Sequence, residues 1–582
     1  MQHTNLRTLD LGLAVAILLA CGVGLTNNSV DPDLWGHVQY GLDAIRDGHL
    51  HHQATYTYTA VGHRWINHEN IAELLFATGM STIGPTALLL IKFAVGMGLF
   101  AWFMRRAYAR GASHAAVGIV FLLASLSLMH FWLIRPQLLS YTLFALMLPI
   151  LSYAFAGWEG NWNLRRDTTA TLDFRRLHAL WLLVPLMLVW ANSHGAFIAG
   201  GCILTAYLGC RTLEILRVQG RAGWKPVAYL TLIATAALAI TLLNPYGWDL
   251  HIKLWHKLRV PRPEIIEWQP PELFSIVWLQ FWALLALWVA AFIGGGKKRD
   301  FTQLVIVSLT LWQAVEHRRH IAFVALLSIA WLAPLVEALL VRLRSKTTVS
   351  PEPSPRTQFA ISAGIAVGGL LAIAMFVDQL RMLPVPRNRY AVDAFQFMHD
   401  RGLDREGKLV VQFEWAQYAI MAFGQRKDGE PGLRVQFDGR FRTCYPQTVL
   451  DRYWDFDMGP TPPGTRYRSP DSPPIDGARV LEHLSPDLVL VGRHRPAAVG
   501  VMESHAAEWT LLYQDKLAQL WGRRTTYGDP ASPRYLPEQL REIGDTPREG
   551  LVPWPGLPID RGPSPTPANV TESPASPSLR SA

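Results

Sequence analysis

Long apolar runs separated by short polar connections dominate the first two thirds of the chain. An α-helix needs about 20 residues to cross the hydrocarbon layer of a bilayer, and eleven runs approach that length. With soft edges, they cover residues 9–25, 86–104, 115–133, 138–156, 179–192, 196–209, 227–243, 274–293, 301–315, 321–341 and 360–377. This pattern predicts an α-helical polytopic membrane protein. A cleaved signal peptide is the alternative interpretation of the first run, although no small-residue cleavage site is evident before Asn27.

The pattern changes after residue 384 to that of a small α/β domain. Helices are predicted at 391–400, 415–423 and 447–453, and short β-type runs bounded by turn residues at 409–413, 433–437 and 488–491. Asp438-Gly439 is interpreted as a strand-to-turn feature. The predicted organisation is a multi-span part at 1–344 with a long loop at 26–85, a cytoplasmic linker at 345–357, a last span at 358–378, an α/β domain at 379–527 and a disordered Pro/Ser-rich tail at 528–582.

Composition and charge restrict the class of protein. Half of the residues are hydrophobic and 17% are charged, which excludes a disordered chain, and four Cys residues, three of them within apolar runs, predict no disulfide. The net charge of +9 reflects basic clusters at 105–110, 165–176, 211–225, 297–299 and 342–346, between alternate pairs of runs. Because Lys and Arg favour the cytoplasmic side, we expect a cytoplasmic N-terminus and an outer 26–85 loop and C-terminal domain. The predicted location is a bacterial inner membrane, with no nucleic-acid partner.

The start of the 26–85 loop carries the strongest candidate chemistry. Asp31 and Asp33 follow the first span directly, and Asp33 can cap a helix running to about residue 45, with His37 one turn later on the same face. A carboxylate there can take a proton from an acceptor hydroxyl, and Asp31, Asp33 and His37 can together hold a divalent metal such as Mg²⁺ or Mn²⁺. The alternative is an Asx-turn and a helix cap, with His37 at the depth of the lipid headgroups.

Other polar residues gather at the predicted outer ends of later spans. They are His68 and Glu69 at the end of the same loop, then Arg135, His194, Asn244, Glu267, His317, Arg318 and Arg319. Ionisable groups at membrane depth are costly and usually face a cavity or a partner, so we expect these residues to line a wet cavity that binds substrate. The three arginines stand on the side that the orientation rule leaves poor in cations, which favours a phosphate-bearing lipid headgroup as ligand. Snorkelling is the alternative for each arginine.

This layout resembles that of the GT-C-type integral-membrane glycosyltransferases, which include protein mannosyltransferases and aminoarabinose transferases. The resemblance covers residues 9–377 in layout and rests on two motifs, at 31–45 and 65–76, that each open a helix in the first outer loop. It implies a polyprenyl-phosphate-linked sugar as donor and Asp33, by its position, as general base. The chain departs from the family where Pro32 splits the acidic pair and where Asn67-His68-Glu69 replaces the common Lys-Pro-Pro.

The resemblance implies a hexosyl- or pentosyltransferase acting on a glycan, lipid or protein acceptor at the outer face of the membrane. The other polar residues of the first loop (Asp31, His37, His68 and Glu69) would then position the acceptor or a metal, and the arginines would neutralise the departing phosphate. Two other classes stay open: a transporter or flippase of a lipid-linked glycan, and a catalytically silent scaffold. A transporter should carry polar or broken sites near mid-membrane, whereas here the polar motifs lie at outer span ends.

Overall fold

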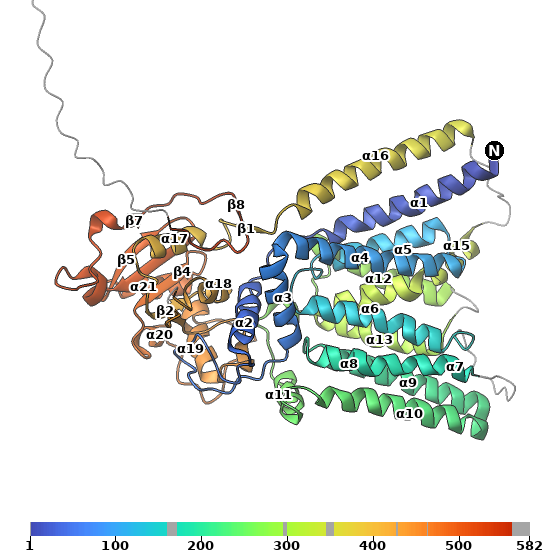
Figure 1. Ribbon diagram of the computed structural model, residues 1–582, viewed down its shortest axis with the longest axis horizontal. Helices are drawn as coiled ribbons and strands as arrows, with labels where there is room; N and C mark the ends of the chain where they lie inside the picture. The colour runs from blue at the N-terminus through green and yellow to red at the C-terminus, as the bar shows by residue number, and fades with distance from the viewer. Residues whose placement is uncertain are drawn as a thin grey trace, which may run out of the picture.

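Each of the eleven predicted runs lies on a helix in the computed structural model, which describes residues 2–159, 172–294, 299–344, 354–426, 429–462 and 464–560. These helices run roughly side by side in one bundle (Figure 1). They are α1 (Gln2–Leu25), α4 (Gly84–Ala109), α5 (His114–Leu128), α6 (Gln137–Ala154), α7 (Phe174–Leu177) continuing into α8 (Leu183–Ala191), α9 (Phe197–Gln219), α10 (Trp224–Ala239), α12 (Leu279–Gly294), α13 (Phe301–Glu316), α14 (Ile321–Leu327) continuing into α15 (Ala333–Leu343), and α16 (Pro355–Leu380).

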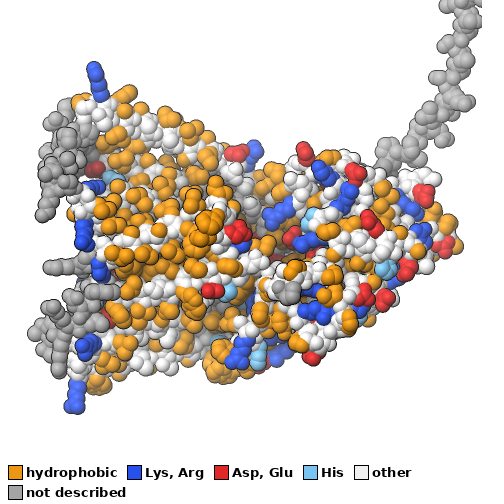
Figure 2. Space-filling view, turned by 180° about the vertical axis from the view of Figure 1, so that it is seen from behind, with side chains coloured by type: hydrophobic (Ala, Val, Ile, Leu, Met, Phe, Trp, Pro, Cys, Tyr) orange, Lys and Arg blue, Asp and Glu red, His pale blue; other side chains and the backbone are white. Residues whose placement is uncertain are grey.

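Among the described residues, seven helical stretches are long and apolar enough to cross a membrane, and one of them, Phe197–Leu242, contains both α9 and α10. Three shorter apolar helices accompany them, at Leu9–Leu25, His114–Leu128 and Phe301–Glu316. The prediction of a mainly helical membrane protein is thus confirmed, whereas the count of eleven spans stays a prediction. Hydrophobic side chains cover the sides of the bundle, and Lys and Arg project from the end farthest from the C-terminal domain (Figure 2). Linker residues 345–353 and the basic positions 165, 166, 297 and 298 lie outside the described residues.

An ionic clamp joins α9 to α13 toward that basic end. Arg211 Nη1 lies 2.7 Å from Glu214 Oε2 and 3.0 Å from Asp300 Oδ2, and Thr302 Oγ1 donates to Glu214 Oε1 at 2.6 Å. All four side chains are buried, so Arg211 is an internal residue and not part of an exposed basic cluster. Because breaking one partner of a buried ion pair is strongly destabilising, the clamp holds the two helices together at this end.

Two short helices of the 26–85 loop, α2 (Leu34–Asp47) and α3 (Asn70–Thr82), cross the end of the bundle nearest the C-terminal domain, where α11 (Trp248–Arg259) also lies (Figure 1). They pack closely because Gly41 lies against the backbone of Glu73, where a Cβ would collide. The helix cap that the sequence predicts at Asp33 is not formed. Asp33 precedes α2, but its side chain makes no capping hydrogen bond, and Asp31 Oδ1 instead accepts the Asp33 N–H at 3.0 Å. The Asp33 carboxylate is therefore available for other contacts.

A six-stranded sheet in the order β3-β2-β4-β6-β5-β7 forms the C-terminal domain. β2 (Gly407–Val411), β3 (Leu433–Val435) and β4 (Leu488–Gly492) are parallel, β5 (Trp509–Gln514) and β6 (Ala518–Arg523) are antiparallel, and β7 (Glu542–Ile543) runs parallel to β5. The helices of the domain are α17 (Val392–Asp400), α18 (Phe413–Phe423), α19 (Gln447–Met458), α20 (Arg479–Glu482) and α21 (Pro496–Ser504). The 26–85 loop extends the sheet edge, because the Val435 N–H donates to Tyr56 O at 2.9 Å.

Residues 528–560, which we expected to be disordered, are folded onto this domain. β8 (Leu551–Pro553) pairs with β1 (Pro384–Pro386), β7 extends the sheet, and Trp554 is buried. The Pro- and Ser-rich composition did not reveal this, because the segment takes its contacts from the domain that it wraps and builds no core of its own. The remaining tail residues, 561–582, lie outside the described residues.

Candidate functional site

A cavity of about 1470 Å³ lies where the bundle, the 26–85 loop and the C-terminal domain meet. Its lining comes from α2, the start of α3, one end each of α9 and α13, the 260–275 segment between α11 and α12, and the C-terminal domain. Of the predicted site residues, it brings together Asp31, Asp33, His37, His68, Glu69, Arg135, His194, Glu267, His317 and Arg319. Two others lie elsewhere. Asn244 closes a turn by donating to Thr241 O and Gly247 O, and Arg318 pairs with Glu272 at 3.2 Å.

The Asp31 carboxylate joins segments of the cavity lining to one another. Its Oδ2 lies 3.2 Å from Nη1 of Arg135, which in turn lies 2.5 Å from Oε1 of Glu267, so the three side chains tie the 26–85 loop to the start of α6 and to the 260–275 segment. The Nε and Nη2 atoms of Arg135 are buried without a hydrogen-bond partner among the described residues. Asp31 and Glu267 already offset the charge of this guanidinium, and a buried unpaired donor costs about 1–3 kcal/mol, so its two free donors suit a neutral acceptor atom of a ligand.

Asp33 lies at the contact between the 26–85 loop and the C-terminal domain. Its carboxylate packs against Gly439 and close to Gln417, and a Cβ at position 439 would collide with it. Burial, reinforced by the negative charge of Asp31, raises the pKa of Asp33 to about 7. A carboxylate with that pKa can accept a proton near neutral pH.

His37, Glu69 and Glu73 form the group that fits a metal ion. His37 Nδ1 lies 3.4 Å from Glu73 Oε1 and 4.0 Å from Glu69 Oε2, and ligand atoms of the three lie within 4.8 Å of one another. Burial alone would lower the pKa of His37, but the hydrogen bond to Glu73 and the charges of both glutamates raise it to about 9. One imidazole and two carboxylates suit a divalent cation. The predicted set of Asp31, Asp33 and His37 differs, because Arg135 engages Asp31 and the C-terminal domain engages Asp33.

Two further histidines border this group. His194 Nε2 lies 3.7 Å and His68 Nε2 3.9 Å from Glu69 Oε1, and the Nδ1 of His194 is 2.9 Å from Ser140 Oγ. Burial and the neighbouring charge of Lys257 lower the pKa of His68 well below its ordinary value, which keeps its imidazole neutral. His68 and His194 therefore both lie beside the Glu69 carboxylate.

Three cations of the lining, close enough to His68 and Glu69 to act on their charges, have no salt-bridge partner within the ranges that the structure describes. Arg262 and Arg319 both lie over the Trp268 ring, with their guanidinium carbons 4.6 and 4.7 Å from its centroid. Lys257 is buried, and burial together with the charge of Arg262 lowers its pKa well below the ordinary value. Burial and the charges of Arg319 and Arg442 lower the pKa of Arg262 to about 10. Such mutual repulsion is relieved when an anion binds.

An apolar groove leads from this cationic cluster of Lys257, Arg262 and Arg319 into the bundle. Ile198 and Cys202 of α9 line one side, and Leu309 and Trp312 of α13 line the other. Leu309 is 42% exposed and Trp312 59% exposed, so this part of the cavity lies open at the apolar surface of the bundle. The clamp at the other ends of α9 and α13 explains why they contact each other there while a cavity separates them here.

Several of these residues were missed in the sequence. Lys257 lies in the last turn of α11 and Arg262 follows that helix, and the orientation rule that singled out Arg319 applies to both. That rule could have found them. Glu73 was not among the predicted metal ligands, and no sequence signal ties Gln417 or Gly439 to Asp33, since their contact depends on how two distant parts of the chain dock.

No known protein family matches the sequence, and no curated protein matches it either. Among solved structures, the chain is similar to the apo form of the oligosaccharyltransferase of Archaeoglobus fulgidus, with 12% identity, coverage of 83% of this chain and 69% of that one, and a TM-score of 0.49. It is also similar to the archaeal oligosaccharyltransferase AglB from Archaeoglobus fulgidus in complex with an inhibitory peptide and a dolichol-phosphate, with 11% identity, coverage of 82% and 69%, and a TM-score of 0.46. Both neighbours are oligosaccharyltransferases.

Proposed function

We propose that this chain is a membrane glycosyltransferase that transfers a sugar from a polyprenyl-phosphate-linked donor to an acceptor at the outer face of the inner membrane. The observation that carries the proposal is one shared cavity with a carboxylate of raised pKa, Asp33, and a cluster of unpaired cations at the head of an apolar groove. A ligand with a phosphate next to a long hydrocarbon chain matches that combination. A water-soluble anion would leave the groove unused.

The chemistry follows from the groups that the cavity presents. An acceptor hydroxyl attacks C1 of the sugar, the bond from C1 to the phosphate oxygen breaks, and the phosphate leaves with the bonding electrons. Asp33 takes the hydroxyl proton, and direct displacement inverts the anomeric centre. Arg262 and Arg319 stabilise the negative charge that grows on the phosphate, the step at which fixed positive charge accelerates a reaction most.

A divalent cation is part of the proposal, with a revised set of ligands. His37, Glu69 and Glu73 would hold it, and a bound ion would supply further positive charge for a phosphate or diphosphate. His68 and His194 flank Glu69 and orient it. The proposal also keeps eleven spans, a cytoplasmic N-terminus and an extracytoplasmic C-terminal domain, because the basic side chains gather at the opposite end of the bundle from the cavity.

The experiment uses the full chain in nanodiscs with undecaprenyl-phosphate-linked hexose and pentose donors. Asp33→Asn should lower transfer at least about a hundredfold, the contribution of a general base, and leave donor binding unchanged. Arg262→Gln with Arg319→Gln should instead weaken donor binding. Asp47→Asn, on an exposed carboxylate at the far end of α2, is the matched control. Full transfer by Asp33→Asn would remove this residue as the base, and unchanged donor affinity in the arginine variant would remove the phosphate site.

A further inference from the structure

The carboxyl ends of the three parallel strands face the cavity. Gln412 and Phe413 follow β2, Asp438 and Gly439 follow β3, and Arg493 to Arg495 follow β4. The chain passes from β2 to β3 on one side and then to β4 on the other, so the topological switch point lies between β2 and β4. In α/β sheets with parallel strands, ligands bind in the crevice outside the carboxyl ends of the strands at this point.

The crevice at this switch point is continuous with the cavity. Phe413 and Glu414 at the start of α18, Trp454 and Met458 of α19, and Arg495 before α21 all line it. The aromatic rings form a wall, with centroids of Phe413 and Trp454 5.7 Å apart and of Phe413 and Phe441 5.4 Å apart. The Phe413 N–H donates to Tyr453 Oη at 2.6 Å, which fixes α19 against the first turn of α18.

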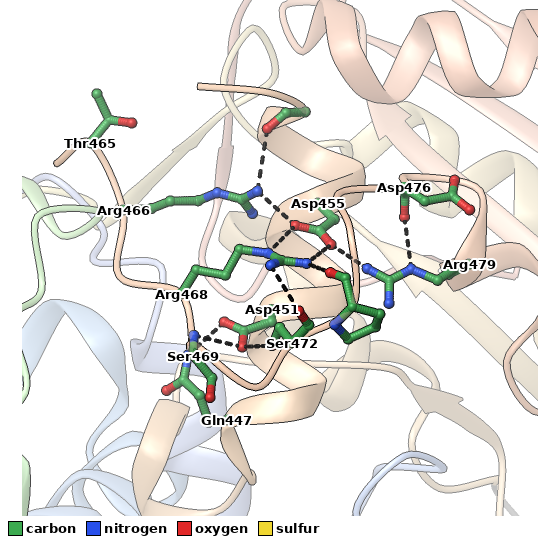
Figure 3. A network of polar contacts seen from close by, with 12 residues as sticks. Gln447, Asp451, Asp455, Thr465, Arg466, Arg468, Ser469, Ser472, Asp476 and Arg479 are labelled. Atoms are coloured by element: carbon green, nitrogen blue, oxygen red, sulfur yellow. Dashed lines mark hydrogen bonds and ion pairs between the residues drawn. The ribbon is translucent and has the colours of Figure 1, made fainter. Parts of the chain in front are cut away.

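A salt-bridge network holds α19 in this place (Figure 3). The Asp455 carboxylate forms ion pairs with Arg466 at 2.6 Å, Arg468 at 3.2 Å and Arg479 at 2.5 Å, and its side chain is fully buried. The 459–478 loop between α19 and α20 is thereby tied to the helix, and its residues Gly464 and Thr465 border the cavity. The aromatic wall is therefore built on a rigid support.

The polar groups of the crevice differ from those of the phosphate site. Arg495 lies 3.5 Å from Glu414 and 3.5 Å from Asp457, so two carboxylates share one guanidinium and the trio has a net negative charge. The Trp454 Nε1 and the Arg495 Nε are buried without a hydrogen-bond partner in the described part of the chain, and Glu414 supplies carboxylate oxygens that can accept. A phosphate would be repelled by the two carboxylates. A ligand with hydroxyl groups can supply both the donors and the acceptors that these atoms lack.

We propose that the crevice between β2 and β4 binds a neutral, hydroxyl-rich glycan as the acceptor, with its pyranose rings on the wall of Phe413 and Trp454 and its hydroxyls on Glu414 and Arg495. The role of this glycan as acceptor rests on the proposed function, because only a transferase has an acceptor. Helix α18 connects the two sites, since Glu414 faces the crevice and Gln417, roughly 5 Å further along the helix axis, lies beside Gly439 and Asp33. This distance between Glu414 and Gln417 along α18 is about the length of one sugar ring. A glycan seated in the crevice therefore presents its terminal hydroxyl at Asp33.

The test measures binding without any donor, on the full chain in nanodiscs. The probes are neutral linear tri- to hexasaccharides of glucose, galactose and mannose, and uncharged Ser/Thr-containing peptides of similar size. Affinity comes from calorimetry, and the position of the ligand from hydrogen exchange of the amides at 412–417 and 493–498. Glu414→Gln is the test variant, and Glu538→Gln, whose side chain is 82% exposed on the far surface of the domain, is the matched control.

At least one glycan should bind and slow exchange in both segments. Glu414→Gln should weaken it about tenfold, as expected for one hydrogen bond to a charged group, and Glu538→Gln should not. Binding of the peptides alone, equal glycan affinity in Glu414→Gln, or no binding of any glycan overturns the inference. Asp33→Asn should keep full glycan affinity, so loss of transfer with retained binding separates the two proposals: a chain that binds glycan in the crevice but never transfers sugar refutes the proposed function and keeps the glycan site.

Discussion

At the scale of single residues, the position of the Asp33 carboxylate depends on a glycine in another domain. Gly439 leaves no room for a Cβ beside Asp33 and Gln417. Gly439→Ala should therefore displace the carboxylate, and because misplacement of a catalytic group by about 1 Å can cost about a hundredfold in rate, transfer should fall by that order. The measurement is the initial rate of sugar transfer, with the thermal unfolding midpoint of each variant recorded in parallel.

Gly500→Ala is the control for this substitution. Gly500 lies within α21 of the same domain, and a Cβ there meets no atom within 4 Å. Alanine is a better helix former than glycine, so this variant should keep its transfer rate and unfold at the same or a higher temperature. Equal activity of the two alanine variants would mean that Gly439 does not position Asp33.

The raised pKa of Asp33 predicts a pH dependence for the transfer reaction. A general base acts in its deprotonated form, and burial with the charge of Asp31 raises the pKa of Asp33 to about 7. The rate should therefore rise about tenfold per pH unit below that value and level off above it. The profile of kcat/KM between pH 5 and 8.5 checks this, and a flat profile in that range would contradict the assignment of Asp33 as base.

At the scale of secondary-structure elements, two carboxylates of α19 hold the 459–478 loop: Asp451 accepts from Ser469 and Ser472, and Asp455 carries the ion pairs. Asp455 neutralises Arg466, Arg468 and Arg479 together (Figure 3). Asp455→Asn leaves these arginines without that charge, so the loop should open more often, and trypsin should cut at them roughly tenfold faster, since protease access follows local opening. Limited digestion followed by mass spectrometry gives the rates.

Asp471→Asn, on an exposed residue of the same loop, should digest at the parent rate. A second restraint on the loop comes from the bundle side, where Glu264 Oε2 accepts the Tyr467 N–H at 3.2 Å and Oε1 lies 3.0 Å from Arg442. If Asp455→Asn leaves digestion unchanged, the contacts of Asp451 and Glu264 are sufficient to hold the loop and the network around Asp455 does not control it.

The elements differ in how well the sequence predicts them, and the reason is physical. Local periodicity or composition, which a single sequence records, marks the apolar runs and also α2, α3, α18 and β4. β7 and β8 have two and three residues and take their stability from partners far along the chain, so composition suggested disorder there. Asp33 could be proposed from its place after the first span. Its contact with Gly439 could not, because that contact is a property of domain docking.

At the scale of the whole molecule, the cavity needs all three parts of the chain. The bundle supplies the apolar groove and Arg319, the 26–85 loop supplies Asp33 and the candidate metal ligands, and the C-terminal domain closes the opposite side. The parts are joined by specific contacts: Arg135 ties loop to bundle, and Arg440 reaches from the C-terminal domain to Thr55 O at 2.5 Å and over the Trp65 ring of the loop. None of the three parts alone therefore contains a complete site.

This arrangement predicts where the lipid tail of a donor lies, and a native cysteine can report it. Cys202 of α9 is exposed in the groove, whereas Cys210 lies two turns further along the same helix, outside the lining of the cavity. Undecaprenyl phosphate should slow alkylation of Cys202 by N-ethylmaleimide at least about fivefold, because the occupied groove excludes the reagent, and it should leave Cys210 unaffected. Peptide mass spectrometry of the unmodified chain in detergent measures both rates in one sample.

Two comparisons make the result specific. Glycerol phosphate has the anionic group without the tail, so it should protect neither cysteine even where it occupies the cationic cluster. Arg262→Gln with Arg319→Gln should raise the lipid concentration needed for protection of Cys202, because those side chains anchor the head of the same ligand. Equal protection of both cysteines would indicate nonspecific coating of the helix by lipid, and an unprotected Cys202 at saturating donor would place the tail outside the space between α9 and α13.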